Sequence, residues 1–151
     1  MNITINTDAS FCPLTKVGGF AFYIICNDFK IQKAGEFRTK PKNPTEAEAM
    51  CIGNAIATLL AQDLPKEVNY IIINTDCLHA ISLIKSYDGV YKKVRKFKNR
   101  LFRVVRPQRI EFRHVKAHNG TPDARSWVND WCDKEAKRYM RQARGRITIQ
   151  N

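Results

Sequence analysis

The order of two hydrophobic periodicities along the chain limits the fold more than any other feature. Three strand-like segments come first and are separated only by short turns, at residues 2–8, 20–25 and 29–39. Helix-like and strand-like segments then alternate, with helices expected at 46–62, 78–86, 90–105 and 127–143 and strands at 68–74 and 109–116. An antiparallel meander followed by alternating helices and strands predicts an α/β fold, in which helices flank a mixed sheet.

The length of 151 residues, 44% of them hydrophobic, fits one domain with a substantial buried core. We expect this domain to cover residues 1–145. Gly145 is a helix stop signal, so the last helix should end before it and residues 146–151 should form a loose C-terminal tail. Thr45 follows a Pro-rich break and is the expected N-cap of the helix over 46–62.

The charge balance points to a polyanionic partner. Lys and Arg number 26 against 14 Asp and Glu, which gives a formal charge of +12. An excess of this size is typical of proteins that bind nucleic acid or a membrane surface, although charge also serves solubility alone. No apolar run approaches the roughly 20 residues that span a bilayer, and the first residues lack a signal-peptide pattern. We therefore expect a cytoplasmic protein. A membrane-surface helix would fit the charge but would not explain the acidic residues described below, so we expect no membrane partner.

The cysteines are odd in number and form no Cys-x-x-Cys pair, which disfavours a disulfide framework or a structural zinc site. We expect reduced and mostly buried thiols instead. The five residues concerned are Cys12, Cys26, Cys51, Cys77 and Cys132.

Two aspartates stand at the ends of expected strands, which is where α/β sheets present functional groups. Asp8 follows the first strand, and Asp76 follows the strand over 68–74. Asp also begins turns and caps helices, so Asp76 could simply be the N-cap of the helix over 78–86.

Further acids lie on the expected helices. Glu48 shares a helical face with the apolar residues Ile52, Ala55, Ile56 and Leu59, where a carboxylate is costly unless it is paired or binds a metal. Glu46 suits the plainer role of a first-turn acid favoured by the helix dipole. In the last helix Asp133 and Glu135 flank the apolar stripe on opposite edges, and periodicity alone does not separate them.

Together these acids could converge at one end of the sheet. Clustered carboxylates repel each other unless a hard dication lies among them. Oxygen ligands without a Cys/His array favour Mg²⁺, with Mn²⁺ able to replace it, over zinc. In a basic protein such a site is typical of phosphodiester chemistry, in which two metal ions activate water and stabilise the leaving oxygen.

Five short motifs with matching element types resemble type 1 ribonuclease H over residues 2–143. In chain order they are Thr7-Asp8-Ala9-Ser10, Ala47-Glu48, Asn74-Thr75-Asp76, Val115-Lys116-Ala117-His118-Asn119-Gly120 and Asn129-Asp130-Trp131-Cys132-Asp133-Lys134-Glu135-Ala136. Each motif alone is weak, whereas all of them in this order are specific.

The resemblance implies the ribonuclease H fold with a five-stranded mixed sheet. It also implies a metal-dependent endonuclease that hydrolyses the RNA strand of RNA–DNA hybrids. Asp8, Glu48, Asp76 and Asp133 match the four metal-binding carboxylates of the family. His118 matches its loop histidine, which is thought to help in proton transfer or product release.

Other positions match the family's contacts with the hybrid. Ser10 falls where the family contacts the RNA strand, and Asn43 and Thr45 fall near its DNA-phosphate pocket. Residues 85–106 hold nine basic side chains against one acid, and the matching region in many bacterial members is a basic protrusion that grips the hybrid backbone. From this region we expect the substrate-binding residues Lys92, Lys93, Arg95, Lys96, Lys98 and Arg100.

Two other functions stay open at this point. One is a nuclease of the same fold that acts on DNA, such as a junction resolvase or a transposase-like enzyme. The other is a nucleic-acid-binding module without catalysis. We expect a monomer, because no apolar surface stripe is left over.

Overall fold

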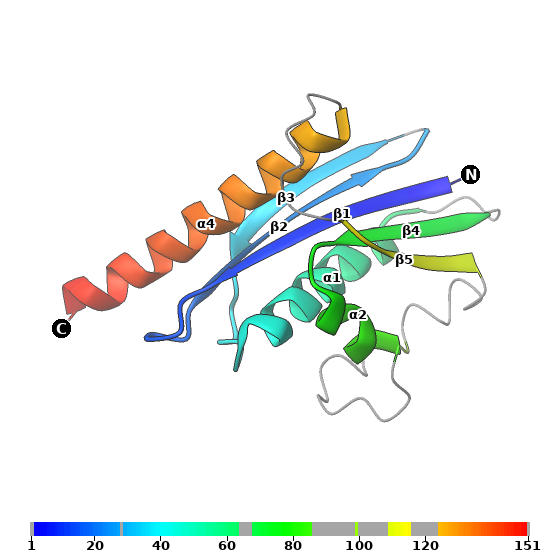
Figure 1. Ribbon diagram of the computed structural model, residues 1–151. Helices are drawn as coiled ribbons and strands as arrows, with labels where there is room; N and C mark the ends of the chain where they lie inside the picture. The colour runs from blue at the N-terminus through cyan, green and yellow to red at the C-terminus, as the bar shows by residue number, and fades with distance from the viewer. Residues whose placement is uncertain are drawn as a thin grey trace.

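The computed structural model describes residues 2–27, 29–63, 68–85, 99, 109–115 and 124–150. Within this part of the chain five strands form one sheet in the order β3-β2-β1-β4-β5 (Figure 1). The strands are β1 (Asn2–Phe11), β2 (Gly18–Ile25), β3 (Lys30–Glu36), β4 (Tyr70–Thr75) and β5 (Ile110–His114).

The sheet is mixed. β1 pairs antiparallel with β2, and β2 pairs antiparallel with β3, because short turns connect these strands. β4 lies parallel to β1 on one side and to β5 on the other. This confirms the predicted α/β class with a meander first and parallel strands after it. The strand over 2–8 extends further than expected, to Phe11, and the strand over 29–39 shortens to Lys30–Glu36.

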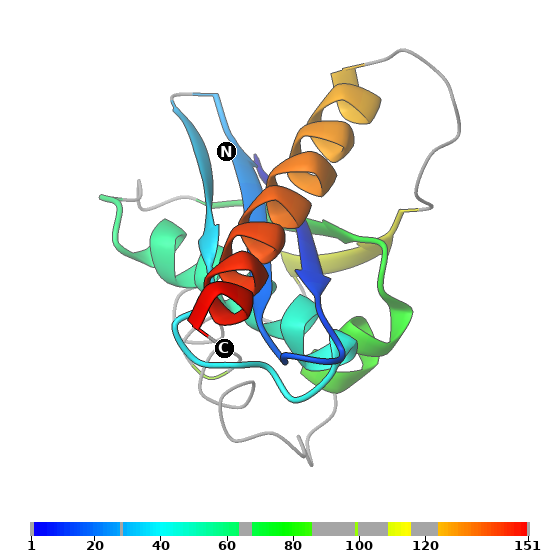
Figure 2. The same cartoon turned by 90° about the vertical axis from the view of Figure 1, so that its left-hand side faces the viewer.

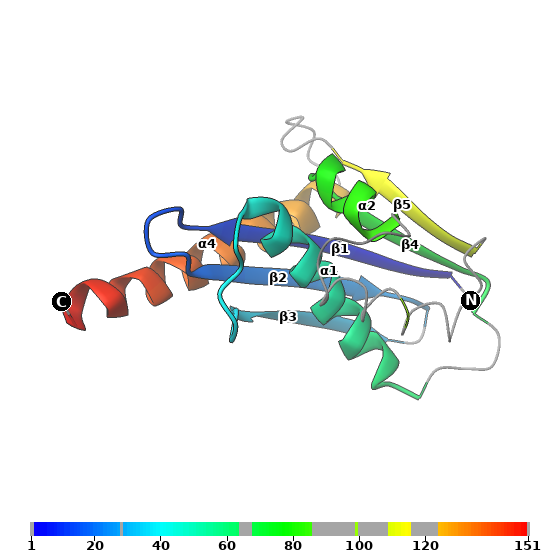
Figure 3. The ribbon, with the colours of Figure 1, turned by 90° about the horizontal axis from the view of Figure 1, so that it is seen from below.

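Helices cover both faces of the sheet. α1 (Pro44–Leu60) and α2 (Leu78–Lys85) lie on one face, and α4 (Ala124–Gln150) lies on the other (Figures 1 and 3). Among the described residues, no helix combines the length and the apolar character needed to cross a membrane.

The main core lies between the sheet and α1. Alternate residues of each strand point to this side, so the odd-numbered isoleucines of β1 and β4 meet the apolar stripe of α1. The fully buried members include Ile3, Ile5, Ile71, Ile73, Ile52, Ile56 and Leu59. A second cluster joins β2 to α4 through Ala21, Tyr23, Val128, Cys132 and Ala136. All five cysteines are free thiols, and only Cys77 is not buried, as predicted.

The N-cap of α1 is Asn43, so the prediction of Thr45 was wrong. The backbone N–H of Glu46 donates to Oδ1 of Asn43 at 2.8 Å. Pro44 takes the first helical position, where its missing N–H costs nothing. Thr45 is therefore already inside the helix. The structure prefers Asn43 because its side chain can reach a free N–H of the first turn.

The C-terminal helix also differs from the prediction. α4 runs through Gly145 to Gln150, so residues 146–150 are not a loose tail (Figure 2). Ile147 packs on a cluster that includes Val17 and Ala143, and the guanidinium of Arg146 forms an ion pair with Glu36 of β3. These contacts offset the cost of about 1 kcal/mol for a glycine inside a helix.

Candidate functional site

Two neighbouring parallel strands carry the same tripeptide, Asn-Thr-Asp. It spans residues 6–8 in β1 and residues 74–76 at the end of β4. Asn6 is paired with Asn74 in the register of the two strands. Because the strands are parallel and in this register, Asp8 and Asp76 reach the same edge of the sheet.

Glu48 approaches this edge from α1. The backbone N–H of Ala9 donates both to Oε1 of Glu48 at 3.2 Å and to Oδ1 of Asp8 at 2.9 Å. Carboxylate oxygens of Asp8, Glu48 and Asp76 then all lie within 4.8 Å of one another. One β-strand amide thus ties the helix acid to the strand acid.

The three carboxylates disfavour each other's ionised form. Burial, and then the charges of Asp76 and Asp133, raises the pKa of Asp8 to about 7. Burial and the charges of Asp8 and Asp76 also raise the pKa of Glu48 well above its usual range. Burial raises the pKa of Asp76 as well, with a further contribution from Asp133, while His114 acts in the opposite direction. Within the described part of the chain, the neighbouring charges do not neutralise this cluster.

The cluster fits a divalent cation. Oε2 of Glu48 is buried and has no hydrogen-bond partner among the described residues, although a buried carboxylate oxygen normally has one. The donor set consists only of carboxylate oxygens, which hard cations prefer. A cation among these groups would both satisfy Glu48 and reverse the repulsion that raises the pKa values.

The structure separates the two acids that periodicity left equivalent in α4. Asp133 lies close enough to Asp8 and Asp76 to raise the pKa of both. Its carboxylate accepts a bond from Nζ of Lys137 at 3.0 Å. Glu135 instead accepts a bond from Arg138 at 2.8 Å on the exposed surface. Asp133 therefore faces the carboxylate cluster.

Other residues expected at the site lie around it or outside the described part. Ser10 is on β1, two residues beyond Asp8, and is half-buried. Asn43 and Thr45 stand at the start of α1, one turn before Glu48. His118 and the six basic residues expected to bind substrate lie outside the described residues, as does the helix expected over 90–105 apart from residue 99. The six are Lys92, Lys93, Arg95, Lys96, Lys98 and Arg100.

Several residues that support the carboxylate cluster were not predicted from the sequence. The side-chain amide of Asn74 donates to Oδ1 of Asn6 at 3.0 Å, two residues before the aspartates. The repeated Asn-Thr-Asp tripeptide could have indicated this pair. The thiol of Cys51 donates to the carbonyl oxygen of Asp8 at 3.2 Å, and burial raises the pKa of this thiol, so it keeps its proton. A ring nitrogen of His114 lies 2.9 Å from the carbonyl oxygen of Asp76. No pattern in the sequence marked Cys51 or His114.

Comparison with known proteins agrees with this geometry. A family model described as RNase H matches residues 1–141. The match spans every described strand and most of α4, including the residues that carry the carboxylate cluster. A comparison with curated proteins gave no match.

Proposed function

The chain belongs to the RNase H family, and from this premise we propose that it is an endonuclease that hydrolyses the RNA strand of RNA–DNA hybrids. The observation that carries the proposal is the triad of Asp8, Glu48 and Asp76, whose carboxylate oxygens lie within 4.8 Å of one another. Family membership supports nuclease chemistry and nucleic-acid binding. The hybrid substrate and the metal requirement are the finer parts of the proposal.

The carboxylates are proposed to hold divalent metal, Mg²⁺ or Mn²⁺ in its place. Asp8, Glu48 and Asp76 would be ligands, and Asp133 would join them from α4. Bound metal ions of this kind lower the pKa of water and stabilise charge on the leaving oxygen. The amide of Ala9 orients Asp8 and Glu48 for this role, because it holds one oxygen of each.

The remaining predicted residues complete the proposal. Ser10 would contact the RNA strand, and Asn43 and Thr45 would contact a DNA phosphate near the start of α1. His118 would help in proton transfer or product release. The basic residues between 92 and 100 would hold the backbone of the hybrid, which would give affinity that depends on salt but not on sequence.

A cleavage assay on matched duplexes tests the proposal. RNA–DNA hybrid, RNA duplex and DNA duplex, each labelled on either strand, are incubated with Mg²⁺, Mn²⁺ or EDTA. We expect cutting of the RNA strand of the hybrid only, and only with metal. Equal cutting of the DNA duplex would favour a DNA nuclease of this fold, and salt-sensitive binding without any cutting would favour a non-catalytic binding module.

Substitutions of the acidic residues test which of them form the active site. Asp8→Asn and Asp76→Asn should lower kcat by roughly three orders of magnitude, because charge stabilisation by bound metal is worth several kcal/mol. Asp133→Asn should also lower kcat. Glu135→Gln is the matched control, because it removes an acid of the same helix that pairs with Arg138. Full activity in Asp8→Asn or Asp76→Asn would contradict the assignment.

A further inference from the structure

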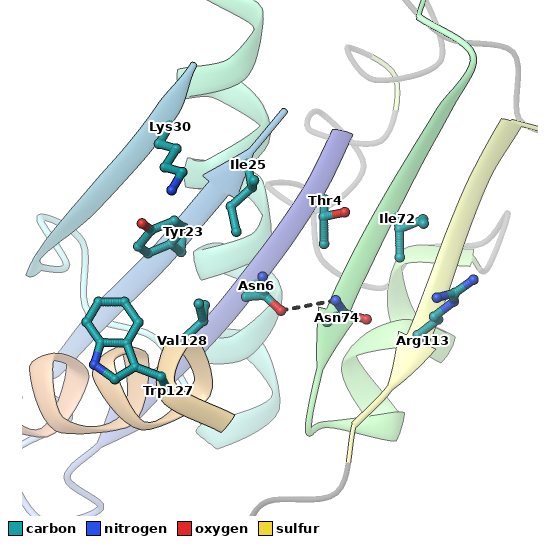
Figure 4. A pocket seen from close by; sticks show the side chains of 10 residues that line it. All are labelled: Thr4, Asn6, Tyr23, Ile25, Lys30, Ile72, Asn74, Arg113, Trp127 and Val128. Atoms are coloured by element: carbon teal, nitrogen blue, oxygen red, sulfur yellow. Dashed lines mark hydrogen bonds between the residues drawn. The ribbon is translucent and has the colours of Figure 1, made fainter. Parts of the chain in front are cut away.

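A groove of about 560 Å³ lies on the sheet face that α4 covers only in part (Figure 4). The strand register explains its floor. Tyr23, Asn6, Asn74 and Arg113 are successive partners across β2, β1, β4 and β5, so their side chains share one face. Lys30 and Ile25 are partners in the next row of the same face.

The groove has an exposed aromatic wall. Trp127, in the first turns of α4, is 58% exposed. Its ring stands edge-on to Tyr23, with centroids 6.2 Å apart, and Tyr23 is held from another side by Trp131 at 6.1 Å. Tyr23 is buried and so holds the ring of Trp127 in place, while much of the surface of Trp127 is exposed to solvent. An exposed tryptophan on a rigid base is typical of a binding surface.

The groove is also cationic. Lys30 on β3 and Arg113 on β5 lie at opposite sides of it (Figure 4), and no acidic side chain is among the described residues that line it. Arg113 makes a bidentate ion pair with Glu111, which lies on the same face as the register partner of Ile72, and both side chains are about half exposed. A phosphate beside Arg113 would replace Glu111 as its partner. With a chain charge of +12, this lining suits a polyanion.

The groove continues from the carboxylate cluster. Asn6 lies in the groove two residues before Asp8 on β1, and Asn74 lies in it two residues before Asp76, which directly follows the end of β4. Side chains two residues apart on a strand share a face. A polymer that passes the carboxylates can therefore extend along the same face onto the groove.

We propose that this groove binds a single-stranded segment of nucleic acid that continues from the substrate, with a base stacked on Trp127 and phosphates beside Lys30 and Arg113. Every base has a π-face, so stacking of this kind tolerates any sequence. The inference rests on the proposed function for the kind of polymer that reaches the site. It adds a contact with the part of the substrate that is not duplex.

The first experiment measures binding of a labelled single-stranded oligonucleotide by fluorescence anisotropy in EDTA, where no metal-dependent cutting occurs. Trp127→Ala should weaken binding by about tenfold, which is the size of one base–aromatic stacking contact. Trp127→Phe should lose less, because it keeps a ring. Circular dichroism checks that both variants keep the helical content of the wild type.

A lysine pair on one strand supplies the matched control. Lys30 is a register partner of Ile25 and faces the groove, whereas Lys33 is a partner of Phe22 and faces the opposite side of the sheet. The logarithm of the binding constant falls linearly with the logarithm of the salt concentration, and Lys30→Gln should make this slope less steep by about 0.7. This is the contribution of one phosphate contact on a single strand. Lys33→Gln removes the same charge from β3 and should leave this slope unchanged.

Intrinsic fluorescence locates the base. The chain has two tryptophans, so Trp131→Phe leaves Trp127 as the only tryptophan reporter. Its emission should be quenched on addition of oligonucleotide. The proposal that the groove binds nucleic acid would be overturned by wild-type affinity in Trp127→Ala, or by equal effects of Lys30→Gln and Lys33→Gln. Either result would point to another occupant, such as an apolar protein segment. Failure to cut hybrid in the presence of metal would overturn the proposed function alone, because binding that depends on Trp127 is measured without cleavage.

Discussion

The side-chain amide of Asn74 donates to the side-chain oxygen of Asn6 at 3.0 Å, across the boundary between two parallel strands. Both residues are buried, with exposed fractions of 6% and 4%. The bond lies two residues before Asp8 of β1 and two residues before Asp76, which directly follows β4, so it holds the two strands in the register that brings the two carboxylates together. A buried amide pair is specific in this way because any other register would leave polar atoms without partners.

This pair should contribute measurably to stability. Asn6→Ala removes the acceptor of the buried bond and should lower the free energy of unfolding by about 1–3 kcal/mol. Asn74→Ala should cost a similar amount, and the double variant should cost less than the sum of the two. Urea unfolding of the three variants measures the coupling. Strict additivity would show that the two amides do not act together.

The stability of the protein should depend on pH because the carboxylates of the cluster have raised pKa values. The pKa of Asp8 rises from its ordinary value of 3.8 to about 7 in the folded protein. Between these values the folded state keeps a proton that the unfolded state has lost, so stability of the metal-free protein falls as pH rises from about 4 to about 7. Glu48 and Asp76 add in the same direction, because their pKa values are also raised.

Asp8→Asn isolates the contribution of this group. The variant lacks the titrating carboxyl, so relative to wild type it should gain about 4 kcal/mol between pH 4 and pH 8. Urea unfolding in EDTA at a series of pH values measures the difference. A difference between variant and wild type that stays constant with pH would contradict the raised pKa.

Metal should remove this penalty. At pH 8, Mg²⁺ at about 100 times its Kd should raise the free energy of unfolding by about 2.7 kcal/mol, and EDTA should reverse the gain. Asp8→Asn and Asp76→Asn should lose most of the increase, because each would remove one of the proposed metal ligands. Glu135→Gln should keep it. Thermal melts with and without metal measure the effect, and an undiminished shift in Asp8→Asn would show that the metal binds elsewhere.

Two glycines should respond in opposite ways to the same substitution. A Cβ at Gly145 would meet no atom within 4 Å, so Gly145→Ala should stabilise α4 by about 0.5–1 kcal/mol. A Cβ at Gly19 would press on the carbonyl of Ala136 and lie 2.7 Å from the amide of Met140. Gly19→Ala should therefore cost about 1–3 kcal/mol, because α4 must move away from β2. Thermal melts of both variants would test this, and equal signs would contradict it.

Local patterns predicted most of the elements. The alternation of Ile3 and Ile5 with polar residues and the apolar stripe around Ile52 depend only on which side of an element is buried, so they can be read from neighbours in the chain. The ends of elements were less predictable. Asn43 was missed as the cap of α1, although its bond with the amide of Glu46 is local. Gly145 was predicted to end the last helix, but the ion pair of Arg146 with the distant residue Glu36 favours a longer helix. The monomeric state and the cytoplasmic location stay predictions.

By itself, then, the sequence determined the kinds and the order of the elements, and it placed single acids at strand ends and on helix faces. Only the tertiary structure decided which acids meet. Asp8 and Asp76 are 68 positions apart, and their closeness depends on strand register and on the Asn6–Asn74 bond. The choice of Asp133 over Glu135 depends on how α4 packs against β2. The physical reason is that periodicity reports burial along one element, whereas a site needs the relative placement of several elements.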